Sequence, residues 1–301
     1  MQTLLVSGGF FDQTLGLLTV IQKTDEGMKI VSDNMIQHPK QEIAVRGKGI
    51  TGIALDGDCV WTCFSNVIVK ISLDDFSIQD MIENEYFNDL HSIEIHNNHL
   101  YIANTGNESV DIINLKTREL ERIDLLGEAI RKKRPLYSQD QDTKPHLHHL
   151  SSVTIDEEGD MIIGLVRQQR ILNLGKWEWI GGKHSSPVHD VEYIAGKIWF
   201  TTVGGTISNS EDFWNLADYQ SELGWTRGLA VTDEGMYVGT TAIRESNQDY
   251  YKVITDSPTE RTGAKICYIP FNKNSENFEL EIPNAGNRKV FSIEVLSKEL
   301  R

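Results

Sequence analysis

Histidines gather in one short stretch of this chain. The segment HLHHL, residues 146–150, holds His146, His148 and His149, which are three of the nine histidines among 301 residues. Neutral imidazole is a common ligand for borderline metal ions, and it also transfers protons near neutral pH. Three imidazoles around an open position can hold a catalytic metal, and a neighbouring arginine can bind a carboxylate or phosphate through two hydrogen bonds. Such chemistry depends on which elements bring the histidines together.

A repeated pattern supplies those elements. Similar segments recur roughly every 40 residues, as in proteins built from structural repeats. Each has alternating apolar residues, a polar or glycine-containing turn and a run of β-branched and aromatic residues, which predicts a β-hairpin. The copies begin at Thr51, His91, Ser151, His189 and Arg227. A third strand and a weaker fourth follow most copies, and four antiparallel strands stacked around an axis make a β-propeller blade.

The two ends of the sequence predict how the ring closes. The segment FSIEVL, from Phe291, matches the first strand of a copy but has no hairpin partner after it. The segments TLLVSGGF and GLLTVIQ, near the N-terminus, match second and third strands without a first. We therefore expect an all-β, six-bladed β-propeller, a single domain over residues 1–301, whose N- and C-terminal strands close one blade. Insertions near 125–148, 208–224 and 244–263 exceed blade length, and they are interpreted as surface loops or, alternatively, as a lid over one mouth of the channel.

The propeller geometry predicts where the histidines meet. The first strand of each blade lines the central channel, so the residues that open the copies should surround one mouth. His91, His189 and Arg227 open three copies, and His149 lies two residues before Ser151 on the loop into the fourth blade. The histidines can then hold a divalent metal, serve as a metal-free set for acid–base catalysis or substrate contact, or cap the channel structurally. These three interpretations stay open.

A second column follows three residues later in three copies. Glu94, Glu192 and Glu294 occupy it, and buried glutamates are costly unless they are paired or hydrogen-bonded. They either bind cations or accept hydrogen bonds from backbone amides of the next blade, and we expect the second. His146 and His148 are expected to flank the site or face solvent.

Composition excludes several kinds of partner. The chain has 29 Lys and Arg against 44 Asp and Glu, a net charge of −15, which disfavours nucleic acids and anionic membrane surfaces. No apolar stretch is long enough to span a bilayer, and the first residues do not match a signal peptide. Three cysteines without framework spacing indicate reduced thiols, so we expect a cytoplasmic protein. No phosphate-binding loop is present, so no nucleotide cofactor is expected. Monomer and dimer both remain possible.

The segment GWTRGLAVTDEGMYVGTTAIRES resembles an uncharacterised bacterial family of six-bladed β-propeller proteins. Its matching features are an aromatic-x-Arg-Gly-Leu strand, a Val-Gly-x-Ser run and an Arg-Glu pair, and further matches lie in DLHSIEI, YIANTGN, HLSSVTIDEEG, SSPVHDVEYIAGKIWF and KVFSIEVL. The chain departs from the family pattern at Ser151-Ser152, where Asn-Gly is usual, and at Thr241, where serine is usual. The resemblance implies the fold and a set of motif positions, but no activity. Those positions are His91, Asn104, Thr105, His149, His189, Arg227, Arg244 and Glu245.

These observations lead to an expected function. We expect an enzyme that acts on a small polar or anionic molecule at the channel mouth, with lyase, isomerase and hydrolase chemistry all open. His91, His149 and His189 would hold a divalent metal or transfer protons. The substrate would contact Arg227, Arg244, Glu245 and Asn104. The alternative is a propeller scaffold that binds a ligand or a peptide without catalysis, since fold alone does not decide between the two.

Overall fold

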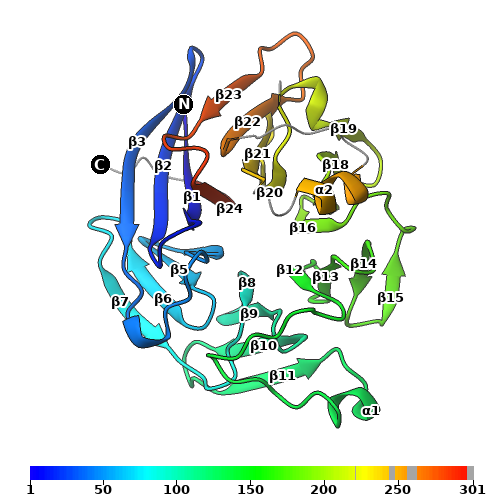
Figure 1. Cartoon of the computed structure of the whole chain (residues 1–301). Helices are drawn as coiled ribbons and strands as arrows, with labels where there is room; N and C mark the ends of the chain where they lie inside the picture. The colour runs from blue at the N-terminus through cyan, green and yellow to red at the C-terminus, as the bar shows by residue number, and fades with distance from the viewer. Residues whose placement is uncertain (221, 244–247, 256–262, 297–301) are drawn as a thin grey trace.

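The protein is a six-bladed β-propeller, as the sequence predicts (Figure 1). The computed structural model describes residues 1–220, 222–243, 248–255 and 263–296. Within these residues, six antiparallel sheets of four strands each surround a central channel. We number the blades 1 to 6 in the order in which the chain completes their outer strands, starting from the blade that contains the N-terminal strand.

The strands of each blade run in sequence order from the channel outwards, except in blade 1. Blade 1 contains β24 (Arg288–Leu296), β1 (Gln2–Phe10), β2 (Gly16–Thr24) and β3 (Gly27–Ile36); blade 2 contains β4 (Gly52–Asp56), β5 (Cys59–Cys63), β6 (Ile68–Ser72) and β7 (Ile78–Ile82); blade 3 contains β8 (Leu90–His96), β9 (His99–Asn104), β10 (Ser109–Asn114) and β11 (Leu120–Asp124). Blade 4 contains β12 (Leu150–Ile155), β13 (Met161–Leu165), β14 (Arg170–Asn173) and β15 (Glu178–Ile180); blade 5 contains β16 (Val188–Ile194), β17 (Lys197–Thr202), β18 (Thr206–Ser208) and β19 (Phe213–Asn215); blade 6 contains β20 (Trp225–Val231), β21 (Gly235–Thr241), β22 (Lys265–Pro270) and β23 (Phe278–Glu281).

The predicted hairpin turns are present. Asn97 and Asn98, between β8 and β9, have φ values of 47° and 61°, and Ala195 and Gly196, between β16 and β17, have 50° and 78°. Two consecutive residues with positive φ are the mark of the tight turn whose twist matches that of paired strands. The turn residues therefore fix the register of the two innermost strands in these blades.

The ring closes where the sequence predicts. The innermost strand of blade 1 is β24, which pairs antiparallel with β1 and places Glu294 opposite Leu5 (Figure 1). Gly8 lies so close to the backbone of β24 that a Cβ atom there would be 2.2 Å from the carbonyl oxygen of Lys289. A larger residue at Gly8 would push the closing strand away, because the contact is with backbone.

The hydrophobic core lies between neighbouring blades. Trp61 in blade 2, for example, is buried against Phe87, Leu90 and Ile93 of blade 3 and its entry loop. This agrees with the general role of large aromatic residues in filling space between propeller blades. Each innermost strand therefore has both faces against neighbouring blades, and its edge faces the channel.

The long connections contain short helices. In the 125–148 segment, α1 (Glu128–Arg131) is followed by a chain that returns across blades 2 and 3, where the Gln139 side chain donates hydrogen bonds to the carbonyl groups of Asn66 and Asn84, both at 3.0 Å. The 3-10 helix η1 (Gln41–Ile43) precedes blade 2, and the 3-10 helix η2 (Leu216–Asp218) follows β19. The helix α2 (Gln248–Thr255) lies in the 244–263 segment, most of which is outside the described residues. No helix in the described part of the chain has the length and apolar character needed to cross a membrane.

Candidate functional site

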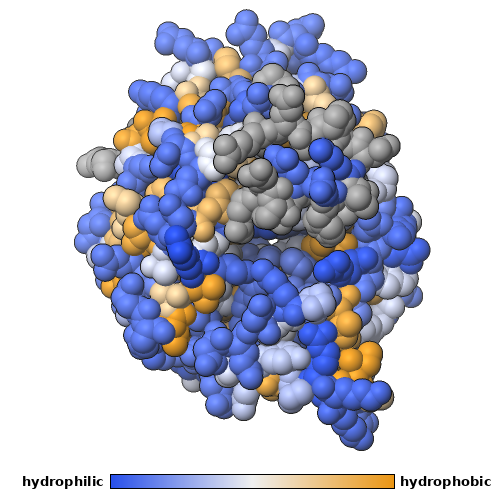
Figure 2. Space-filling view, in the orientation of Figure 1, coloured by the Kyte–Doolittle hydropathy of each residue, from blue (hydrophilic) through white to orange (hydrophobic). Residues whose placement is uncertain are grey.

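A cavity of about 590 Å³ opens at one mouth of the channel. Its walls come from the loops that lead into the innermost strands and from the first residues of those strands. His91 on β8, His149 just before β12, Arg227 on β20 and Phe291 on β24 all line it. The face of the ring in Figure 2 is largely hydrophilic and is hollowed near its centre. The predicted meeting of residues from different blades therefore occurs here.

A buried carboxylate holds the histidine-rich loop in place. Glu108, only 1% exposed, accepts hydrogen bonds from the backbone N–H groups of Leu147, His148 at 3.0 Å and His149 at 3.1 Å. His149 itself has a φ of 55°, a conformation that is uncommon for residues other than glycine. The three hydrogen bonds stabilise this unfavourable backbone conformation and fix the direction of the His149 side chain.

Replacement of Glu108 by glutamine is expected to lower the free energy of unfolding by about 2 kcal/mol, because hydrogen bonds to a charged acceptor are stronger and an amide nitrogen would face a backbone N–H. Urea denaturation followed by circular dichroism measures the change. The control is Glu121→Gln on β11 of the same blade, where the side chain is exposed and little effect is expected. Equal stability of the two variants would contradict a role for Glu108 in holding the loop.

Two contacts join three imidazoles near the mouth, both of them to His149. Nδ1 of His146 lies 3.1 Å from Nδ1 of His149, and the rings of His91 and His149 are perpendicular with centroids 5.0 Å apart. Nε2 of His146 is 3.0 Å from the hydroxyl of Thr143, which belongs to the long 125–148 segment. His146 was expected at the edge of the site or in solvent, but it is buried and in contact with His149.

An acidic residue missed by the sequence analysis lies beneath these rings. Asp89 is buried, pairs with Lys48, and approaches Nε2 of His146 at 3.6 Å and Nδ1 of His91 at 3.8 Å. Burial opposes its ionisation, but the Lys48 ammonium and the two imidazoles hold the pKa of Asp89 well below its usual range. The carboxylate is therefore ionised, and its charge is balanced chiefly by Lys48.

The backbone assigns the tautomer of His91. Nδ1 of His91 lies 2.9 Å from the carbonyl oxygen of Asp89, which can only accept a hydrogen bond, so Nδ1 carries the proton. Burial lowers the pKa of His91 to about 3 despite the nearby carboxylate, and burial together with the neighbouring imidazoles places that of His149 well below 6.5. Both rings are therefore neutral at pH 7, and the unprotonated Nε2 of His91 is available to accept a proton.

Basic side chains form much of the remaining wall. Five of them line the cavity against three carboxylates, although the whole chain is strongly acidic; these residues are Arg46, Lys48, Lys144, Arg227 and Lys289, with Asp89, Asp140 and Asp142. The guanidinium of Arg227 lies over the rings of Phe291 at 4.9 Å and Trp225 at 5.7 Å. These stacking contacts hold the planar guanidinium at the cavity wall. The local charge favours an anionic ligand.

His189 does not join the other two predicted histidines in this cavity. It lines a narrower cavity of about 30 Å³ deeper in the channel, where its Nδ1 lies 3.2 Å from Oδ1 of Asp190. The third imidazole beside His91 and His149 is instead His146. The expected set of His91, His149 and His189 as ligands of one divalent metal is therefore not preassembled, and a metal held by these three residues stays a prediction.

The remaining expected site residues lie in different places. Arg227 is at the mouth, whereas Arg244 and Glu245 lie outside the described residues. Asn104 is fully buried, and its side-chain amide donates to the carbonyl of Tyr86 and the carboxylate of Asp111, both at 2.8 Å. Asn104 therefore stabilises the interior of blade 3 and does not line the mouth cavity, contrary to its expected contact with substrate.

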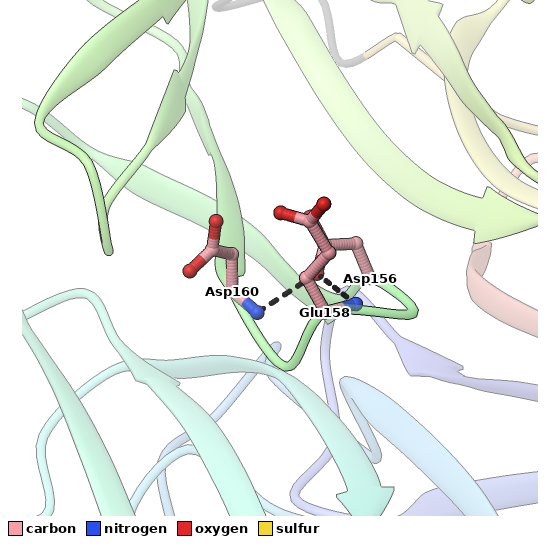
Figure 3. A group of neighbouring side chains, drawn as sticks. All are labelled: Asp156, Glu158 and Asp160. Atoms are coloured by element: carbon pink, nitrogen blue, oxygen red, sulfur yellow. Dashed lines mark hydrogen bonds between the residues drawn. The ribbon is translucent and has the colours of Figure 1, made fainter.

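One exposed acidic group has metal-ligand spacing. Asp156, Glu158 and Asp160, in the turn between β12 and β13, place one ligand atom each within 4.8 Å of one another, the single such group of three in the described part of the chain (Figure 3). Asp156 accepts hydrogen bonds from the backbone of the other two, as the dashed lines show. Lys176 already contacts Glu158 and Asp160, both at 2.8 Å. This group could bind a metal only in competition with that ammonium.

Comparison with known proteins supports the fold. No protein-family model matches the chain. No curated protein is similar to it in sequence. A protein of unknown function from Bacteroides caccae is similar in structure, with a TM-score of 0.64 and 11% identity over 99% of both chains. A chain of a nidogen/laminin complex has a TM-score of 0.61 and 9% identity over 97% of this chain and 98% of that one.

A more distant likeness is to virginiamycin B lyase from Staphylococcus aureus, with a TM-score of 0.47 and 14% identity over 74% of this chain and 73% of the lyase. The first two likenesses show a shared fold, and none of the three shows a shared activity. The expected resemblance to uncharacterised bacterial six-bladed propellers is thus confirmed for the fold.

Proposed function

We propose that the mouth cavity binds a small anionic molecule and that His91 and His149 move a proton on it, as in an elimination or an isomerisation next to a carboxylate. The observation that carries this proposal is the lining of the 590 Å³ cavity, where basic side chains lie together with buried neutral imidazoles. A cavity of this size is typical of small-molecule sites, and histidine is the commonest acid–base group in catalysis.

Each group has a distinct part in this scheme. Arg227 would hold the carboxylate or phosphate of the ligand in a two-pronged contact. The unprotonated Nε2 of His91, or an imidazole nitrogen of His149, would take the proton from the carbon beside that group. Lys48 and Lys289 would stabilise the negative charge that then develops on the ligand oxygen. In an elimination the leaving group departs with the electron pair, and in an isomerisation the proton returns to a different carbon.

Metal-assisted chemistry is the second use of the same residues. His91 and His149 would supply two imidazole ligands for a divalent ion, but Nδ1 of His149 faces His146 at 3.1 Å, and His189 lies deeper in the channel. Because catalytic zinc sites generally have three protein ligands, these residues fit a metal less well than they fit proton transfer. We therefore base the proposal on acid–base catalysis.

Ligand binding is expected to be coupled to proton uptake. The imidazoles are neutral in the free protein because burial lowers the pKa of His91 and His149, and an anion beside them favours the protonated form. Affinity should therefore rise as the pH falls from 8 to 6, by up to about tenfold per pH unit where binding adds one full proton to a histidine. Isothermal titration with sulfate, which does not itself titrate in this range, measures the affinity. Equal affinities at both pH values would contradict the coupling.

Deuterium incorporation into the ligand distinguishes an enzyme from a binding scaffold. Small hydroxy acids and unsaturated acids incubated with the protein in D₂O should gain deuterium at the carbon beside the carboxylate, observed by proton NMR. The Glu121→Gln variant should catalyse this deuterium incorporation as fast as the wild type. The His149→Gln variant should catalyse it at least about 100-fold more slowly, since general acid–base groups contribute that much. Binding of these acids without exchange would instead favour a non-catalytic ligand-binding propeller.

A further inference from the structure

Three glutamates form a ring in the channel below the mouth. Glu94 on β8, Glu192 on β16 and Glu294 on β24 belong to blades 3, 5 and 1, which alternate around the axis. They occupy equivalent positions on innermost strands, since each follows a buried aliphatic residue and lies opposite the second strand of its blade. The equivalent positions of blades 2, 4 and 6 hold the smaller residues Ala54, Thr154 and Ala230. The small residues leave room at the axis for the three longer side chains.

The three carboxylates have no protein partner among the residues that the structure describes. Their side chains line the 30 Å³ channel cavity, and in the described part of the chain no backbone amide or basic side chain forms a hydrogen bond or ion pair with them. The expected hydrogen bonds to backbone amides of the next blade are therefore absent. Burial raises the pKa of Glu94 to about 7, burial and the charge of Glu94 raise that of Glu294 to about 8, and burial and both neighbours place that of Glu192 well above its usual value. Unpaired carboxylates in such a place destabilise the fold unless a cation joins them.

A fourth polar side chain of the same cavity, that of His189, uses only one of its two ring nitrogens within the described residues. His189 is 4% exposed, and its Nε2 makes no hydrogen bond in the described structure, nor does the buried hydroxyl of Ser152. Nδ1 of His189 lies 3.2 Å from the carboxylate of Asp190, which is itself held by Thr201 at 2.6 Å and by the backbone N–H of Gly228 at 3.0 Å. A histidine that donates one N–H to a fixed carboxylate presents its other nitrogen as a lone pair, which is the usual arrangement of a metal-binding imidazole.

We propose that this channel binds one divalent cation that prefers oxygen ligands, such as Mn²⁺ or Ca²⁺, among Glu94, Glu192 and Glu294. The Nε2 of His189 faces the ion from the mouth side of the same cavity, directly or through a water molecule. Carboxylates are preferred ligands of these ions, and Mn²⁺ also accepts imidazole. The free volume of about 30 Å³ suits one ion or water and excludes an organic molecule.

The three carboxylates of the ring stand apart from one another in this structure. Their ligand atoms do not meet the 4.8 Å mutual distance that the exposed group at Asp156 satisfies, so binding requires the glutamates to turn inwards or to hold the ion through its water shell. Glutamate has enough rotatable bonds for either arrangement. The channel glutamates and the exposed turn at Asp156 are therefore two alternative sites for the ion. One substitution in each group shows which of them binds it.

The test is a titration of the full chain with MnCl₂ after treatment with EDTA. The electron paramagnetic resonance signal of free Mn²⁺ disappears when the ion binds, so the titration gives affinity and stoichiometry. We expect one tightly bound ion per chain in the wild type and about 100-fold weaker binding in Glu192→Gln, since loss of a ligand costs at least as much as loss of its supporting group. The matched control is Glu158→Gln, the same chemical change in the exposed acidic turn, which should bind like the wild type.

Three results would overturn the proposal: no bound Mn²⁺ in the wild type, unchanged binding in Glu192→Gln, or loss of binding in Glu158→Gln. Glu294→Gln provides a second channel variant and should weaken binding as Glu192→Gln does. Circular dichroism checks that the variants fold, and folding is expected because each substitution removes a like charge from the ring. Titration with CaCl₂ in the presence of Mn²⁺ shows which ion the ring prefers.

Discussion

Glu192→Gln is expected to stabilise the folded protein at pH 8 in buffer that contains EDTA, and to change its stability little at pH 5. In the unfolded chain the glutamates lose their protons at the usual pKa of a glutamate. In the folded protein the pKa is about 7 for Glu94 and about 8 for Glu294, and the pKa of Glu192 is also raised. The unfolded state therefore holds fewer protons between pH 4.5 and 8, so wild-type stability declines as the pH rises through that window. An uncharged glutamine removes the cost of burying the Glu192 carboxylate. It also removes the repulsion between that carboxylate and those of Glu94 and Glu294.

The free energy of unfolding is expected to rise by about 2 kcal/mol at pH 8, a figure reduced for solvent screening because these side chains are only half-buried. Thermal unfolding at the two pH values measures it, and a gain of that size raises the Tm by about 3 °C for a chain of this length. Glu158→Gln is again the matched control, with no change expected at either pH. Destabilisation by Glu192→Gln in cation-free buffer would show that the carboxylate has a favourable partner in the fold.

Arg227→Met is expected to weaken the binding of a dicarboxylate such as succinate by about 100-fold, because a two-pronged contact between a guanidinium and a carboxylate is among the strongest hydrogen-bonded pairs. Methionine keeps an unbranched side chain beside Phe291 and Trp225, the rings over which the guanidinium now lies. Isothermal titration at pH 7 measures the loss.

Arg227→Lys is the informative comparison, since it retains the charge but loses the planar fork. We expect its affinity for succinate to lie between those of the wild type and Arg227→Met. If all three proteins bind succinate equally, the anion does not lie against Arg227, and other basic groups of the cavity, such as Lys48 and Lys144, hold it.

The fold follows from sequence periodicity because each blade repeats the same local pattern. The hairpin at Asn97 and Asn98, for example, has both its strands and its turn within fifteen residues of sequence, from Leu90 to Asn104. Ring closure was also predictable, since a first strand near Phe291 lacked a partner and the N-terminal strands lacked a first. The hairpins involve segments that are close in sequence. The closure was inferred because one terminal segment lacked the strand that the other supplied.

The site was predicted less completely, and the error has a geometric cause. His149 was expected to reach the same mouth as His91 and His189 from two residues before the position that opens its copy. Two residues along a strand span about 6.6 Å, so side chains of the two columns reach different depths. The opening residue His91 lines both the mouth cavity and the deeper one, whereas the opening residue His189 lines only the deeper one. The mouth is reached by side chains two positions before the opening residues, and those residues are Asp89, His149, Trp225 and Lys289. A second aligned column would have identified Asp89 and Lys289.

Other site residues could not have been found in this way. Glu108 lies about 40 positions before the loop that it holds, and nothing in its local sequence shows that its carboxylate is buried. Lys48 and Thr143 reach the histidines from a loop before blade 2 and from the long 125–148 segment. Contacts of that kind depend on how the loops fold over the mouth, which strand periodicity does not describe.

The pairing of β24 with β1 affects how the protein folds during its synthesis on the ribosome. Blade 1 cannot be completed when its first three strands emerge, because the innermost strand is synthesised only after the five other blades. Until then β1 exposes an unpaired edge, and the ring of glutamates lacks its member from β24. Nascent chains of this protein therefore pass through a long interval in which association with another copy is possible, and the closing strand ends that interval.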